Sequence, residues 1–125
     1  MAEQALDLWP KLETVNIRTP LNVLKQQAAL LGKHTGNILE ARVITQPMPP
    51  GFLHRFMIEA PIMAYQIELF SVTHDLNLYP VRTMSDGADG ESLASEENLV
   101  EWLKAKLNSA ATKRILATLM AQAES

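Results

Sequence analysis

The sequence contains no cysteine, 6% aromatic residues and only five glycines among 125 residues. The absence of cysteine excludes disulfide frameworks, thiolate zinc sites and cysteine nucleophiles. No stretch of about 18 apolar residues occurs, and residues 1–4 lack the basic start and apolar core of a signal peptide. Membrane spanning and secretion by that route are therefore not expected, and we predict a cytoplasmic protein.

Strong charge and catalytic motifs are also missing. The net charge of -3 provides no basic surface for nucleic acid, so nucleic acid is not an expected partner. No serine occupies a nucleophile elbow, no glycine-rich loop has phosphate-binding spacing, and no helix carries a metalloprotease histidine pair. Hydrolase, kinase and dehydrogenase activities have no support, and no cofactor or metal is predicted.

The composition that remains, 47% hydrophobic and 20% charged, is typical of a globular protein. We predict one domain over residues 1–125. Its first 18 residues form an arm with too many apolar side chains for a free tail. Pro10 prevents this arm from being one continuous helix. We expect the arm to pack on the body of the protein or on a neighbouring chain, through Leu6, Leu8, Trp9, Leu12, Val15 and Ile17.

Three helices are predicted from capping residues and helical spacing of apolar side chains. Thr19 followed by Pro20 indicates a helix over residues 20–33. Ser95, followed by two glutamates, begins a second helix over residues 96–107. Ser109 begins a third over residues 110–123.

Between the first two helices, residues 38–84 have the spacing of strands. Four runs are indicated, at 38–46, 52–60, 65–74 and 76–84, and the prolines of residues 47–51 predict a connection. The order of elements predicts an α+β fold: a four-stranded antiparallel meander with the helices packed mainly on one face.

The second face of this sheet looks too apolar to face water. In strict alternation, Phe70 and Val72 fall on the side opposite Tyr65, Ile67 and Leu69. That side also carries large apolar residues on the neighbouring strands and charges that could form cross-strand pairs. The apolar members are Ile44, Leu53, Met57, Phe70 and Val72, and the charged ones are Glu40, Arg42, Arg55, Glu59 and Glu68.

An apolar centre within a charged frame is typical of an interface. The arm, a C-terminal helix or another chain could cover it. We predict a partner-binding surface formed by Leu53, Arg55, Met57, Phe70 and Val72.

Two sequence patterns suggest a metal site, but neither supplies the ligands in the required arrangement. His34, His54 and His74 are spaced twenty residues apart, but strict alternation places His54 and His74 on different faces, which only a bulge or an unusual register could reconcile. The loop over residues 85–96 resembles a calcium-binding loop, but Ser85 and Gly87 stand where carboxylate or amide ligands are needed.

The leading hypothesis is a small non-catalytic binding or accessory protein that docks to a protein partner through a sheet face or edge, with a homodimer as one form. An immunity or antitoxin-type inhibitor is a specific version of this hypothesis. The alternative is an enzyme or ligand-binding protein with a polar pocket formed by His54, Arg55, Glu68, Tyr65 and Tyr79. That pocket requires these side chains to converge.

Overall fold

The predicted meander forms and is extended by a fifth strand. In the computed structural model, which describes residues 6–13, 17–84 and 90–125, five antiparallel strands lie in the order in which they occur in the chain. A short 3₁₀ helix, η1 (Pro61–Met63), joins the second strand to the third. The strands are β1 (Glu40–Met48), β2 (Gly51–Ala60), β3 (Tyr65–His74), β4 (Val81–Met84) and β5 (Ser92–Leu93).

The three helices begin where their capping residues predict. They are α1 (Pro20–His34), α2 (Glu96–Leu107) and α3 (Ala110–Ala123). The side-chain oxygens of Thr19, Ser95 and Ser109 each accept a hydrogen bond from a backbone N–H in the first turn, at 3.0–3.2 Å. The α+β prediction and the placement of all three helices are confirmed.

The strands differ from the prediction in three places. The run over residues 76–84 was expected to be one strand, but β4 begins only at Val81. Pro47 lies within β1, opposite Phe52, although a connection was expected there. An edge strand tolerates proline because half of its N–H groups have no strand to donate to. The prediction of four strands was also wrong, because Ser92 and Leu93 pair with β4 within the segment expected to be a loop.

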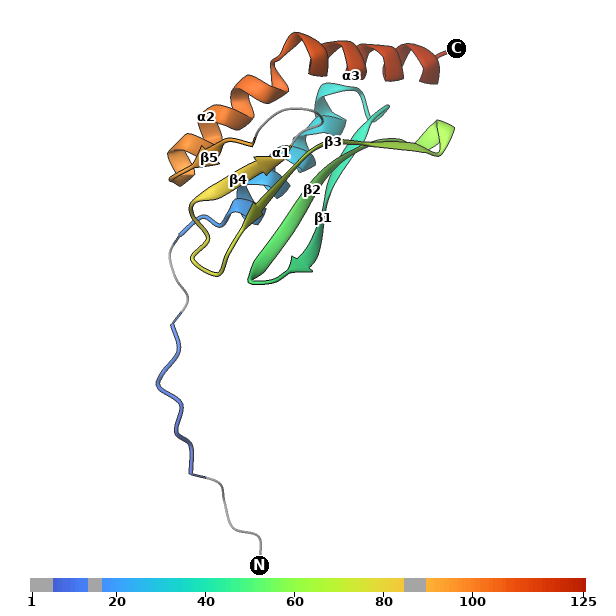
Figure 1. The fold of residues 1–125 in the computed structure, drawn as a ribbon. Coiled ribbons are helices and arrows are strands. Elements are labelled where there is room, and N and C mark those ends of the chain that lie inside the picture. Colours follow the sequence, from blue (N-terminus) through green and yellow to red (C-terminus); the bar gives the residue numbers. More distant parts are fainter. Residues whose placement is uncertain (1–5, 14–16, 85–89) are drawn as a thin grey trace, which may run out of the picture.

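The helices and the sheet enclose one hydrophobic core. Figure 1 shows α1 behind the strands and α2 followed by α3 along the top of the view. Val23 and Leu24 of α1 are buried in the same cluster as Phe56 of β2 and Leu103 of α2. Trp102 of α2 meets the ring of Phe70 edge-on, with centroids 5.0 Å apart. Leu119 of α3 belongs to the same cluster, so all three helices pack on the same face of the sheet.

A β-bulge in β3 decides which side chains belong to this core. Met57 pairs with Glu68, but the preceding residue of β2, Phe56, pairs with Phe70, so Leu69 is an extra residue in β3. After the bulge, Phe70 and Val72 point toward the helices and are almost completely buried. The prediction that they lie on the second face is wrong, because strict alternation does not hold across the extra residue.

The N-terminal arm is described over residues 6–13. Leu6, Leu8, Trp9 and Leu12 are between 76% and 81% exposed, so the body of the protein does not cover them. Packing of the arm on a neighbouring chain stays a prediction. Residues 1–5, 14–16 and 85–89 lie outside the described residues, and they include Val15 of the arm and the first part of the calcium-like loop.

The bulge can be tested with one substitution on each side of β3. Val72→Asp would bury a charge in the core and should destabilise the protein by roughly 4 kcal/mol or more. Thr73→Asp, the adjacent residue on the opposite face, should change stability by about 1 kcal/mol or less. Urea unfolding followed by circular dichroism measures both values. The reverse order of effects would show that β3 continues without a bulge.

Candidate functional site

The face of the sheet that points away from the helices, here called the open face, is crossed by four rows of side chains. Polar and charged residues dominate it, and Ile44, Leu53, Met57 and Met84 supply its apolar part. The rows are Glu40, Glu59 and Gln66; Arg42, Met57 and Glu68; Ile44, Arg55, Ser71 and Met84; and Gln46, Leu53, Thr73, Arg82 and Ser92.

Two ion pairs frame the centre of the open face. The Nε of Arg55 lies 2.6 Å from a carboxylate oxygen of Glu68, and Arg42 pairs with Glu59. The five charged residues predicted for one face do lie on one face. Because these groups are partly exposed to solvent, each pair contributes at most about 1 kcal/mol to stability. Their clearer effect is to hold two guanidinium groups in fixed positions beside Met57, which is only 5% exposed.

The predicted partner-binding residues divide between the two faces. Leu53, Arg55 and Met57 lie on the open face, whereas Phe70 and Val72 lie in the core. A docking surface that includes all five is therefore not formed. The residues that strict alternation missed are Ser71 and Thr73, which replace Phe70 and Val72 on the open face and make it more polar than expected.

The residues of the predicted ligand pocket do not converge either. His54 is buried on the helix side of β2, whereas Arg55 and Glu68 point to the open face. Tyr65 is half-exposed at the start of β3. The hydroxyl of Tyr79 donates to the carbonyl oxygen of Arg18 at 2.9 Å, and burial raises the pKa of this tyrosine, with Glu96 adding to the shift and Arg18 opposing it.

The bulge instead brings two of the three histidines together. His54 and His74 become diagonal neighbours on the helix side of β2 and β3, with their Nε2 atoms 2.7 Å apart. Their rings stack at a centroid distance of 4.8 Å. His34 lies at the end of α1 and does not join them. Within the described part of the chain, no group of three His, Asp or Glu side chains could hold a metal ion.

The hydrogen bonds around the pair determine which nitrogen carries each proton. His74 Nδ1 lies 2.7 Å from the carbonyl oxygen of Asp75, which can only accept, so Nδ1 carries the proton of this ring. A neutral His74 then accepts at Nε2 from the Nε2–H of His54. His54 Nδ1, in turn, accepts from the hydroxyl of Thr45 at 2.9 Å. This series of hydrogen bonds is complete when both rings are neutral.

The surroundings favour the neutral form of His54. Burial lowers the pKa of His54 from its ordinary value of 6.5 to about 4, and repulsion from His74 and from Lys25 of α1 acts in the same direction. The carboxylate of Asp75 accepts the backbone N–H of Asn77 at 2.7 Å. All four ring nitrogens are engaged, so neither imidazole has a free lone pair for a metal ion or for general-base catalysis.

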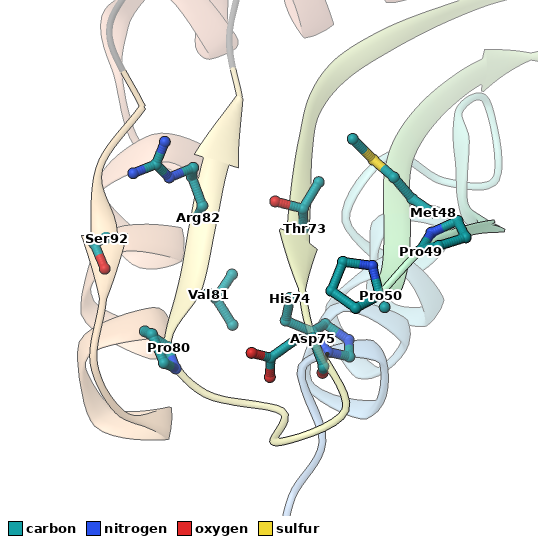
Figure 2. A pocket seen from close by; sticks show the side chains of 11 residues that line it. Met48, Pro49, Pro50, Thr73, His74, Asp75, Pro80, Val81, Arg82 and Ser92 are labelled. Carbon is teal, nitrogen blue, oxygen red and sulfur yellow. Dashed lines mark hydrogen bonds between the residues drawn. The ribbon is translucent and has the colours of Figure 1, made fainter.

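Two cavities lie near the histidine pair. One, of about 190 Å³, is formed by Thr19, Leu21, Thr45, Phe52, His54, His74 and Leu78. The other, of about 330 Å³, opens at the margin of the open face between the β1–β2 turn and the pair β4 and β5, where Figure 2 shows Met48, Pro50, Thr73 and Arg82 around it. Gly51 allows this turn to approach β3, since a Cβ there would lie 1.9 Å from the carbonyl oxygen of His74.

Comparison with protein-family models, with curated proteins and with solved structures found no match to this chain. Among the described residues, no helix has both the length and the apolar character needed to cross a bilayer. The surfaces and cavities of the chain itself are therefore the basis for inferring its function.

The low pKa of His54 predicts a loss of stability on acidification. In the unfolded chain the pKa of His54 is near 6.5, and in the folded protein it is about 4, so the unfolded state binds a proton more readily. The free energy of unfolding should therefore fall as the pH decreases from 6.5 toward 4. Between pH 7 and pH 5 the loss attributable to His54 is roughly 2 kcal/mol. Urea unfolding at a series of pH values measures it.

The matched variants are His54→Gln, which keeps a side chain that can both donate and accept, and His34→Gln, which removes the exposed histidine. The first should flatten the pH dependence between pH 7 and pH 5, and the second should leave it unchanged. An unchanged slope in His54→Gln would rule out His54 as the group responsible.

Proposed function

We propose that this protein is a small non-catalytic binding or accessory protein that docks to a protein partner through the open face of its sheet. The observation that carries the proposal is that all three helices cover the opposite face, while no element among the described residues covers this one. An uncovered sheet face with apolar side chains inside a polar frame has the anatomy of an interface.

The residue types on the open face support this proposal. Methionine and arginine are enriched in protein interfaces, and Met48, Met57 and Met84 lie on this side of the sheet together with three arginines. Met48 and Met84 are almost half exposed. Methionine side chains adapt their shape to a partner because they are unbranched and polarizable.

The shape of this side of the sheet provides a place for an anchoring side chain. The cavity of about 330 Å³ lies where the open face meets the β1–β2 turn, and Arg82 stands at its border (Figure 2). A partner side chain that fills a pocket and is shielded there from water can supply a large share of the binding free energy. Leu53 lies next to Thr73 in the same row of the open face, within reach of a partner that inserts one side chain here.

The free edge of β1 borders the same surface. β1 is nine residues long, and no strand in the described part of the chain pairs with its outer edge. Unpaired backbone groups along an edge can bind an extended segment of another chain. A partner on the open face can therefore extend its contact onto this edge.

The proposal can be tested with a photo-crosslinking amino acid at one of two exposed positions. Gln46 lies on the open face and Glu101 lies on α2. Crosslinking in cells should yield an adduct of defined mass from Gln46 and none from Glu101. Adding Leu53→Glu should lower the yield at Gln46 at least fivefold, because it places a charge in the apolar part of the surface.

Mass spectrometry of the adduct identifies the partner, including a second copy of this chain. Circular dichroism of Leu53→Glu checks that the variant is folded. Docking through the open face is contradicted if Gln46 yields no adduct, if Glu101 yields the same adduct, or if Leu53→Glu leaves the yield unchanged.

A further inference from the structure

A groove runs along α1 on the helix side of the molecule, away from the open face. It consists of two adjoining hollows of about 320 Å³ and 410 Å³ that share Gln27, Leu107 and Asn108 in their walls. The first begins at Arg18 and Val23, and the second extends to Leu31 and His34 at the end of α1. The groove thus lies between α1 on one side and α2 and α3 on the other, with Phe56, Ile58 and Leu69 in its floor.

The walls of the groove combine an apolar interior with a cationic border. Leucines from all three helices line it, including Leu30, Leu103 and Leu116. Arg18, Lys104 and Lys113 lie among the lining residues, and the described lining residues include no Asp or Glu. Such a groove fits an apolar segment that also carries negative charge.

The arm over residues 6–13 has this character. Its four large apolar side chains, Leu6, Leu8, Trp9 and Leu12, are 76–81% exposed. Asp7 and Glu13 outnumber its single cationic residue, Lys11. Four exposed apolar side chains within seven residues are unusual for a surface that stays in water, which indicates that another surface covers them.

The lengths of the arm and the groove also agree. Eight residues in extended conformation span roughly 26 Å. The fifteen residues of α1, along which the groove runs, span about 22 Å. One arm can therefore occupy both hollows.

The body holds the root of the arm at the mouth of the groove. The carbonyl oxygen of Arg18 accepts the hydroxyl of Tyr79, and the Nε of Arg18 lies 3.6 Å from a carboxylate oxygen of Glu96. Arg18 also lines the first hollow. The described part of the arm, residues 6–13, carries large apolar side chains that its own chain leaves uncovered.

We propose that the groove of each protomer binds residues 6–13 of a second copy, so that two copies form a homodimer by exchanging their arms. A twofold axis makes the exchange reciprocal and buries two arms and two grooves. With four large side chains in each arm, the buried surface is on the order of the ~1,200–2,000 Å² of standard stable interfaces. The proposal uses the helix side alone and does not depend on docking through the open face.

The first experiment is size-exclusion chromatography with light scattering on the full chain. The parent protein should be a dimer. Trp9→Glu in the arm and Leu30→Glu at the border of the groove, where the leucine is 42% exposed, should each weaken self-association at least tenfold. Leu76→Glu is the matched control, since Leu76 is a 75% exposed leucine outside both the arm and the groove, and this variant should remain a dimer. Circular dichroism verifies that each variant is folded.

The second experiment uses the absence of native cysteine to locate the arm. A preparation carrying Leu12→Cys is mixed with one carrying Leu30→Cys under mild oxidation, and the product should be a disulfide-linked pair containing one chain of each kind. In a chain carrying both substitutions, a disulfide formed only within one chain would overturn the exchange in favour of a folded-back arm. A monomeric parent, or a dimer that withstands Trp9→Glu and Leu30→Glu, would overturn it too.

Discussion

The extra residue at Leu69 is the constraint on which the arrangement of this sheet depends. Without it, Phe70 and Val72 would face water and Ser71 and Thr73 would lie under the helices. Burial of a large apolar side chain contributes about 1.5–3 kcal/mol, whereas one disrupted ladder hydrogen bond costs about 0.5–1.5 kcal/mol. The bulged register is therefore favoured by several kcal/mol, since two apolar side chains are buried at the expense of one irregularity in the ladder.

The one-residue shift at the bulge also determines which side chains lie on each face of the sheet. On the helix side, the rings of Phe56 and Phe70 stack with centroids 4.9 Å apart, and Trp102 packs against Phe70. Farther along, the shift places His74 beside His54 in a hydrogen-bond chain that uses all four ring nitrogens. On the open face it leaves small polar side chains next to Arg55, so the surface is mixed in polarity.

The sequence predicted the helices well because their signals are local. Thr19, Ser95 and Ser109 are capping residues whose effect extends over one turn, and each helix begins directly after one of them. The face of β3 depends on its pairing with β2 and was predicted incorrectly by strict alternation. A signal was present: the apolar positions change phase at Leu69 and Phe70, two adjacent apolar residues, which is what a bulge produces.

Other features depend on pairing between strands and could not be predicted from local sequence patterns. β5 consists of two residues, too short for a periodic pattern, and it exists because β4 offers a free edge. The contact between His54 and His74 depends on a one-residue shift in register, so the twenty-residue spacing of the histidines carried no information about it. The separation of His54 from Arg55 follows directly from the pleat, since adjacent residues of a strand point to opposite faces.

Binding through the open face and binding through the arm differ in how much conformational entropy is lost. Arg55 and Met57 belong to β2, the strand whose other side is the most buried part of the core, so their positions are fixed before any partner arrives. Binding there requires no ordering of the backbone, so the conformational entropy lost is that of the side chains alone. The arm must be ordered along its whole length when it enters a groove, which offsets part of the free energy gained by burying its four apolar side chains. At equal buried area, the arm therefore gives the weaker and more readily reversible contact.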